Sequence, residues 1–341
     1  MSSKSKVLII YTGGTIGMIN DPKTGHLISF DFKHIYHHVP ELERLNIDLT
    51  TISFEHPVDS SKMNPKRWAE IAQIVYDNYA LYDGFVILHG SDTMAYTASG
   101  LSFMLQGLKK PVILTGSQLP IGTIRTDGKE NLITAIEIAA SKDDKGESIV
   151  QEVAVYFEYS LYRGNRSSKV SANQFEAFSS PNYPELAVAG VNIKFNKEQL
   201  LRTKNSDFQL FTNFDNHVAI LKIFPGFSAT VYKSIFNFSL VKGIIIETFG
   251  AGNAPSDADF RELITNYIAE GGIVVNITQC SSGSVEQGKY ETSSFFSKVG
   301  VVSGSDMTTE AALAKLMYLL GSETSNEIIK QKLMKSIVGE L

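Results

Sequence analysis

The chain has 341 residues, 43% apolar and 20% charged, a composition typical of a soluble globular protein large enough for two domains. Its 31 basic and 36 acidic residues give a net charge of −5, which argues against nucleic acid or an anionic membrane as the main partner. A single cysteine, Cys280, excludes an intrachain disulfide and a Cys-x-x-Cys site. No window approaches a membrane span, and the first apolar run is too short for a secretory signal, so we expect a cytoplasmic protein.

The first half of the chain repeats one pattern: an apolar run, a short loop rich in Gly or Ser, and an amphipathic helix. The apolar runs are continuous rather than alternating, which is typical of strands covered on both faces of a parallel sheet. The predicted strands are Val7–Tyr11, Thr51–Val58, Phe85–His89 and Val112–Thr115, and the predicted helices are Pro65–Tyr79, Ala95–Leu105 and Asn131–Ala140. Asn64 suits the N-cap of the first helix and Pro65 its first position.

Residues 194–216 are polar and irregular, and we interpret them as a linker. A second α/β pattern follows, with predicted strands Val218–Phe224, Gly243–Phe249 and Ile273–Ile277 and predicted helices Asp257–Glu270 and Thr309–Leu320. The sequence therefore predicts a larger N-terminal domain with a doubly wound, mostly parallel sheet, residues 1–193, and a smaller C-terminal α/β domain, residues 217–341.

Polar loops follow each of the four predicted N-terminal strands. These loops are Tyr11–Thr15, Asp59–Ser61, Gly90–Thr93 and Gly116–Gln118. Ligands of open parallel sheets bind at the carboxyl ends of the strands, so we expect the four loops to open on one rim.

Two consecutive glycines, Gly13 and Gly14, precede Thr15 at the end of the first strand. One interpretation is an ordinary tight turn from strand to helix. The other is that the glycines take positive φ, leave backbone N–H groups free to face an anion or oxyanion, and hold Thr15 as an exposed hydroxyl. A phosphate-binding loop is disfavoured because no GxxxxGK[ST] pattern follows.

Carboxylates and hydroxyls recur in the next two loops. Ser91 or Asp92 of "HGSDT" would serve equally as the cap of the following helix. Alternatively, Asp59 and Asp92 hold an ammonium group while Ser60 and nearby backbone N–H groups hold a carboxylate. That arrangement predicts a small zwitterionic ligand, an amino acid.

A basic stretch, "SLYRGNRSSKV", contains Arg163, Arg166 and Lys169. It is either a solvated loop or a segment that brings Lys169 to the rim, where it would pair with Asp92. A lysine there could take the proton of a hydroxyl nucleophile if it were neutral.

Other chemistries find little support. His34, His37 and His38 lack a carboxylate-bearing metal motif, and we interpret them as helix-surface residues. There is no GxSxG elbow, which disfavours a Ser-His-Asp hydrolase, and "GAGNAP" lacks the third glycine of a dinucleotide fingerprint. We therefore expect neither a metal nor a cofactor.

The segments "YTGGTIGM", "DSSKM", "LHGSDTMAYTASGLSFML", "LYRGNRSSK" and "GAGNAPS" together resemble the cytoplasmic, type I bacterial L-asparaginases of the asparaginase/glutaminase family. The resemblance covers nearly the whole chain in the same order, and TGGTI combined with an HGxDT motif is specific to that family. It implies hydrolysis of L-asparagine to L-aspartate and ammonia through a hydroxyl nucleophile and an acyl-enzyme, without metal or cofactor.

The resemblance also implies roles for individual residues. Thr15 and Ser91 would be the two candidate hydroxyl nucleophiles, and Lys169 and Asp92 the lysine–carboxylate pair. The substrate-binding set would be Gly14, Asp59, Ser60, Ser61, Ser91, Asp92 and Asn253. Members assemble as homodimers or dimers of dimers, and Asn253 would reach the site of a neighbouring subunit.

Two positions depart from the family pattern. Ser91 stands where the family usually has threonine, which keeps the hydroxyl but loses the methyl that restricts the rotamer. The loop after Thr15, marked by the turn formers Asp21 and Pro22, is expected to close over the substrate but carries His26 where a tyrosine is usual. A Thr–Tyr–Glu activation of Thr15 is therefore not expected unless another tyrosine substitutes; Ser91 could instead align a water.

Three alternative functions remain at the level of sequence. The amidase subunit of a tRNA-dependent amidotransferase shares these motifs. A non-catalytic asparagine-binding sensor would keep the fold without releasing ammonia. Weak glutaminase activity is also compatible, because one methylene changes binding by only about 1–3 kcal/mol.

Overall fold

The computed structural model describes residues 4–20, 27–29, 39–202, 207–288 and 291–341. The chain divides into two compact units, Met1–Thr212 and Asn213–Leu341. This division falls inside the segment 194–216 that the sequence suggested as a linker. The predicted histidine cluster His34, His37 and His38 lies outside the described residues.

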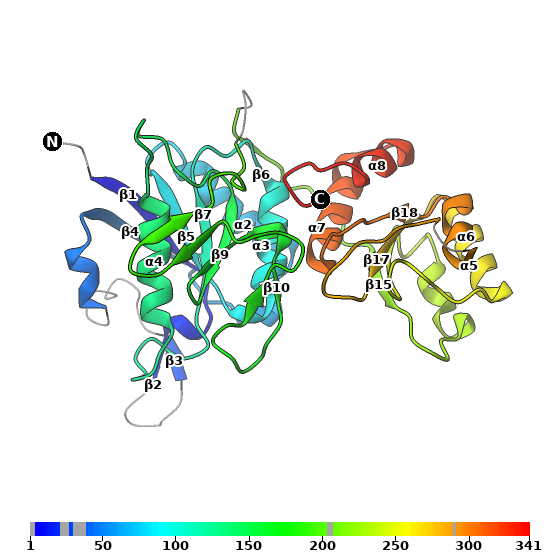
Figure 1. Ribbon diagram of the computed structural model, residues 1–341, viewed down its shortest axis with the longest axis horizontal. Coiled ribbons are helices and arrows are strands. Elements are labelled where there is room, and N and C mark those ends of the chain that lie inside the picture. The colour runs from blue at the N-terminus through cyan, green and yellow to red at the C-terminus, as the bar shows by residue number, and fades with distance from the viewer. Residues whose placement is uncertain (1–3, 21–26, 30–38, 203–206, 289–290) are drawn as a thin grey trace. The chain divides into compact units, whose positions relative to one another are not determined.

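Unit 1 is built on an eight-stranded sheet with strand order β13-β12-β9-β8-β7-β5-β1-β4 (Figure 1). Its parallel part comprises β1 (Ser5–Tyr11), β4 (Ile47–Ser53), β5 (Gly84–Leu88), β7 (Val112–Thr115) and β8 (Val153–Phe157). An antiparallel extension follows, formed by β9 (Ser160–Arg163), β12 (Ala187–Ala189) and β13 (Ile193–Phe195). The predicted mostly parallel sheet is therefore confirmed.

The continuous apolar runs form strands that are buried on both faces. Val7 to Ile10 of β1 and Phe85 to Leu88 of β5 have no exposed surface, as expected for the centre of a covered parallel sheet. Helix α4 (Gly128–Ala140) packs through Leu132 and Ile136 against the face that carries Val7 and Ile9. Helices α2 (Pro65–Asn78) and α3 (Met94–Met104) pack against each other, and α3 contacts β7 and β8.

Two predicted boundaries in unit 1 were wrong. The strand expected at Thr51–Val58 is β4, Ile47–Ser53, because all seven of its residues pair with β1 from Ser5↔Ile47 to Tyr11↔Ser53. The segment 194–216 is not wholly irregular: it shares β13 with the sheet, and β14 (Gln209–Leu210) pairs with β6 (Leu105–Gln106). Short strands of this kind form through their partners and leave little periodicity in the sequence.

Two small antiparallel pairs complete unit 1 beside its 3-10 turns. Strands β2 (Met18–Asn20) and β3 (Leu27–Ser29) form one pair, and β10 (Ser168–Lys169) and β11 (Phe178–Ser179) form the other. The 3-10 turns are Thr15–Gly17, Pro40–Arg44, Ser60–Lys62, Ser91–Thr93 and Gly164–Arg166. Four of these five turns belong to the loops that the sequence marked as chemically interesting.

Unit 2 has its own four-stranded, all-parallel sheet and its own core. The strand order is β15 (Val218–Lys222), β16 (Gly243–Thr248), β17 (Ile273–Thr278) and β18 (Val302–Ser303). Its helices are α5 (Ala258–Ala269), α6 (Glu291–Val299), α7 (Thr309–Ser322) and α8 (Asn326–Leu333), with a 3-10 segment at Ala229–Phe236. The predicted smaller C-terminal α/β unit is therefore confirmed.

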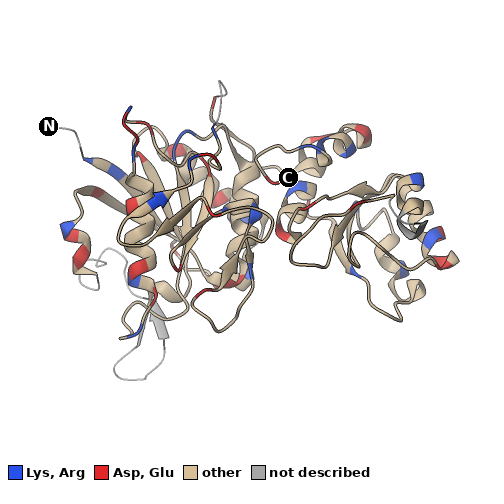
Figure 2. Ribbon diagram, in the orientation of Figure 1, with Lys and Arg blue, Asp and Glu red and all other residues tan. Residues whose placement is uncertain are grey.

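Charged residues occur throughout both units. Acidic and basic positions are interspersed along the ribbon (Figure 2), as expected from the nearly balanced composition. Among the described helices none is long and apolar enough to cross a bilayer.

Candidate active site

The two glycines after β1 bring two loops into direct backbone contact. Gly13 and Gly14 have φ of 134° and 90°, in the region that side chains disfavour. A Cβ on Gly14 would lie 2.5 Å from the backbone nitrogen of Gly90, and a Cβ on Gly13 would lie 2.2 Å from the carbonyl oxygen of Val58. Both glycines are therefore required by close approach, and Thr15 and Ser91 each lie one residue beyond the contact.

The loop after β4 joins the same cluster. A Cβ on Gly90 would lie 2.6 Å from Ser60 Oγ, and Thr93 Oγ1 donates to the Ser60 carbonyl at 2.7 Å. Ser60 is only 4% exposed. The loops after β1, β4 and β5 therefore meet at one rim, as the parallel topology predicts.

Asp59 lies at the exposed edge of this cluster and caps its own turn. Its Oδ1 accepts from the Ser61 backbone N–H at 2.9 Å. This hydrogen bond lowers the pKa of the Asp59 carboxyl, so the side chain is ionised at neutral pH. An ionised carboxylate at the rim suits an ammonium ligand.

Lys169 reaches the third loop from a distant part of the chain. Its Nζ donates to Ser91 Oγ at 2.9 Å and to Asp92 Oδ1 at 2.7 Å. The Lys169 side chain is 16% exposed and that of Asp92 is 70% exposed, so the pair stands between the interior and solvent. A hydroxyl, an ammonium and a carboxylate thus form one hydrogen-bonded group.

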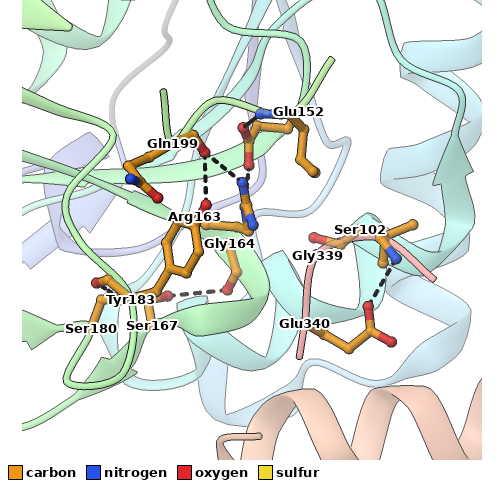
Figure 3. Close-up of polar contacts among 12 residues, drawn as sticks. Ser102, Glu152, Arg163, Gly164, Ser167, Ser180, Tyr183, Gln199, Gly339 and Glu340 are labelled. Atoms are coloured by element: carbon orange, nitrogen blue, oxygen red, sulfur yellow. Dashed lines mark hydrogen bonds and ion pairs between the residues drawn. The ribbon is translucent and has the colours of Figure 1, made fainter. Parts of the chain in front are cut away.

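The arginines that precede Lys169 are buried rather than solvated. Arg163 Nε bonds Glu152 Oε2 at 2.6 Å, and its guanidinium also donates to the Gln199 carbonyl at 2.7 Å and stacks 4.2 Å from the Tyr183 ring centroid (Figure 3). Arg166 is 3% exposed and donates to the Asn182 carbonyl. These contacts fix the turn after β9, and β10 then carries Lys169 in register with Phe178 of β11.

A buried histidine fixes the start of the Ser91 loop. His89 has no exposed surface; its Nδ1 lies 2.6 Å from the Gly90 carbonyl oxygen and its Nε2 lies 2.9 Å from Thr97 Oγ1. The carbonyl can only accept, so Nδ1 carries the hydrogen and Nε2 accepts from Thr97. Burial lowers the pKa of His89 to about 4, so the ring is neutral at physiological pH.

The loop after β7 supplies a residue to which the sequence assigned no role. Ser91 Oγ donates to Gln118 Oε1 at 3.1 Å, and Gln118 Nε2 donates to the Gln174 carbonyl at 3.1 Å. The sequence placed Gln118 on the rim, after the fourth strand, but nothing in its residue type distinguished it from an ordinary loop glutamine.

Some predicted site residues are not brought to this cluster. Asn253 belongs to unit 2, in a tight turn closed by its backbone pairing with Phe249. His26, Asp21 and Pro22, expected in the closing loop, lie outside the described residues. Within the described part of the chain, no group of three or more His, Cys, Asp or Glu side chains is placed to hold a metal ion.

The fold and this cluster define a class of protein. It is a two-unit α/β protein in which loops at the carboxyl ends of parallel strands gather two hydroxyl residues, a lysine and two carboxylates around a glycine-lined contact. The arrangement has the elements of nucleophilic catalysis on a small polar substrate: a hydroxyl, a proton-handling group and backbone N–H donors.

Comparisons with known proteins identify the family. Residues 6–201 match the family model "Asparaginase, N-terminal", and residues 217–333 match the "Glutaminase/Asparaginase C-terminal domain". The chain is similar to L-asparaginase 1 of Escherichia coli K12, with 40% identity over 99% of this chain and 98% of that protein. The chain belongs to the asparaginase/glutaminase family.

Two further similarities place the chain within that family. The crystal structure of L-asparaginase I from Vibrio cholerae superposes with a TM-score of 0.90 at 39% identity, covering 99% of both chains. A protein of the Glutamyl-tRNA(Gln) amidotransferase of Pyrococcus abyssi is 32% identical and more distant, with 98% of this chain covering 76% of that protein.

Proposed function

We propose that this protein is an L-asparaginase, which hydrolyses the side-chain amide of L-asparagine to give L-aspartate and ammonia. The observation that carries this proposal is the group formed by Lys169 with Ser91 and Asp92, one residue from the backbone contact between Gly14 and Gly90. The similarity to L-asparaginase 1 over nearly the full length of both chains supports the same reaction.

In the proposed reaction, Thr15 Oγ1 attacks the amide carbon of asparagine. The C–N bond breaks, ammonia leaves with the proton of the hydroxyl, and an acyl ester on Thr15 remains. Water then hydrolyses the ester and releases aspartate. Backbone N–H groups near Gly14 and Ser91 would stabilise the oxyanion, each such donor being worth roughly 10²–10³ in rate.

The remaining residues divide between proton handling and binding. Lys169, Asp92 and Ser91 would manage the proton and align the hydrolytic water. The ionised Asp59, together with Asp92, would hold the substrate ammonium, while Ser60, Ser61 and adjacent N–H groups would hold the α-carboxylate. No metal or cofactor takes part in this scheme.

The deciding experiment measures ammonia released from asparagine and from glutamine across a concentration series. We expect turnover of asparagine and slower turnover of glutamine, whose extra methylene changes binding by only about 1–3 kcal/mol. Binding of asparagine without ammonia release would instead indicate a sensor. Turnover only in the presence of charged tRNA would indicate an amidotransferase component.

We also propose a homodimer or dimer of dimers in the cytoplasm. In that assembly Asn253 would contribute to the site of a neighbouring subunit. A lone, exposed Cys280 that cannot form an intrachain disulfide suits a reducing compartment. Sedimentation of the purified protein gives the assembly state, and Asn253→Ala should then raise KM without changing the assembly; a monomer with full activity would refute this role.

A further inference from the structure

The loop that carries Gln118 is fixed by a single carboxylate. Asp127, 5% exposed, accepts from the Gln118 N–H through Oδ2 at 2.8 Å and from the Leu119 N–H through Oδ1 at 3.0 Å. The fully buried Asn131 donates through Nδ2 to the Gly116 carbonyl at 3.1 Å. The backbone of Gln118 is therefore tied to helix α4 and to the end of β7.

The two ends of the Gln118 amide are distinguished by their partners. One end lies 3.1 Å from the Gln174 carbonyl oxygen, which can only accept a hydrogen bond, so that end must be the NH₂ group. The other end, 3.1 Å from Ser91 Oγ, is then the amide oxygen. Because an amide oxygen carries no hydrogen, Ser91 must be the donor in this contact.

The hydrogen-bond capacity of Ser91 is thereby assigned. Its one proton is committed to Gln118, and its lone pairs remain. One lone pair accepts from the Lys169 ammonium at 2.9 Å, since an ammonium group can only donate. A neutral amide oxygen is too weak a base to take the Ser91 proton, so Ser91 in this arrangement acts as a hydrogen-bond acceptor toward the reacting groups.

We infer that Gln118 is a positioning residue that directs the Ser91 hydroxyl hydrogen away from Lys169 and so leaves the attacking role to Thr15. The inference rests on the proposed function and deepens it by assigning different roles to the two candidate hydroxyls. The same amide also ties Ser91 to the hairpin segment after Lys169, through Gln174, so one side chain keeps both members of the Ser91–Lys169 contact in place.

The test is Gln118→Met, which keeps the length of the side chain but removes both its donor and its acceptor. We expect kcat for asparagine to fall roughly tenfold, the effect of about one lost hydrogen bond at the reacting group, while the Kd for L-aspartate stays within about twofold. Gln73→Met, on the exposed face of α2, is the matched control and should leave both values unchanged.

A second measurement separates orientation of the hydroxyl from general support of the loop. In a Ser91→Ala background there is no hydroxyl to orient, so Gln118→Met should cost no further turnover. A further tenfold loss there, an unchanged kcat in the single variant, or a loss of aspartate affinity with intact kcat would each overturn the inference. Wild-type protein that releases no ammonia would refute the proposed function itself, which keeps the two failures apart.

Discussion

Thr15 stands at the residue scale as the proposed nucleophile. It is half-buried and follows two glycines whose conformation is fixed by contact with neighbouring loops. We expect Thr15→Ala to keep the fold and to lose at least ~10³ in turnover, because the hydroxyl forms the bond that defines the reaction. Ammonia release together with thermal unfolding gives both values, and near-normal turnover in this variant would assign the attack to another group.

Lys169 is expected to act on the rate rather than on substrate affinity. Its ammonium group contacts Ser91 and Asp92 within one hydrogen-bonded group. Lys169→Met should lower kcat strongly and change the Kd for L-aspartate little, whereas Lys129→Met on the surface should change neither. A large loss of affinity with intact turnover would show that Lys169 binds the substrate instead.

His89 gives the fold a pH dependence with a definite sign. Its pKa falls from 6.5 to about 4 on burial, so between these values the unfolded chain binds a proton that the folded chain does not. The contribution of His89 to the free energy of unfolding therefore falls as the pH drops from 6.5 to 4, by about 3 kcal/mol in total. Denaturant unfolding at pH 7 and pH 4.5 should show a smaller difference for His89→Asn than for the wild type; equal differences would contradict this origin.

At the scale of elements, the contact between the loops after β1 and β5 depends on the absence of a side chain. Gly14 and Gly146 have similar φ, 90° and 79°, but only Gly14 faces another backbone; nothing lies within 4 Å of a Cβ built on Gly146. Gly14→Ala should therefore cost about 1–3 kcal/mol more in unfolding free energy than Gly146→Ala, which bears only the backbone strain.

The consequence should also be visible in activity. Because Gly14 and Gly90 set the spacing between Thr15 and Ser91, Gly14→Ala should lose turnover as well as stability, while Gly146→Ala should keep wild-type kcat. Equal stability losses in the two variants would mean that the loops can separate without strain.

At the scale of the molecule, each unit has its own sheet and core, so damage to one should be felt there first. In unit 2 Lys315 Nζ bonds Glu340 Oε1 at 2.6 Å and the carbonyls of Leu333 and Lys335, and neither charged side chain is exposed. Removing one member of a buried pair costs about 3–5 kcal/mol, because the other charge stays uncompensated.

Lys315→Met should accordingly lower the stability of unit 2, measured as the calorimetric transition of residues 213–341, and release the C-terminal segment to proteolysis. Lys335→Met, which removes an exposed side chain, is the control and should shift neither measure. A uniform shift of the whole thermogram would indicate that the two units unfold together.

The sequence by itself determined the class of the fold and the position of the site within it. Strands buried on both faces must be apolar throughout, so β1, β5 and β7 were visible as continuous runs, and the parallel topology sent the loops after them to one rim. The caps and periodicity of α2 fixed its start at Pro65, because local hydrogen bonds and burial of one face act within the helix itself.

Only the tertiary structure decided which side chains meet. Ser91 and Lys169 are 78 residues apart in sequence, and their contact depends on buried arginine pairing and on the β10–β11 register, neither of which leaves a local pattern. The role of Gln118 was invisible for the same reason: a glutamine in a loop acquires direction only from the atoms around it. Local composition reports burial and turns, whereas the geometry of a site comes from contacts between segments that the sequence does not order.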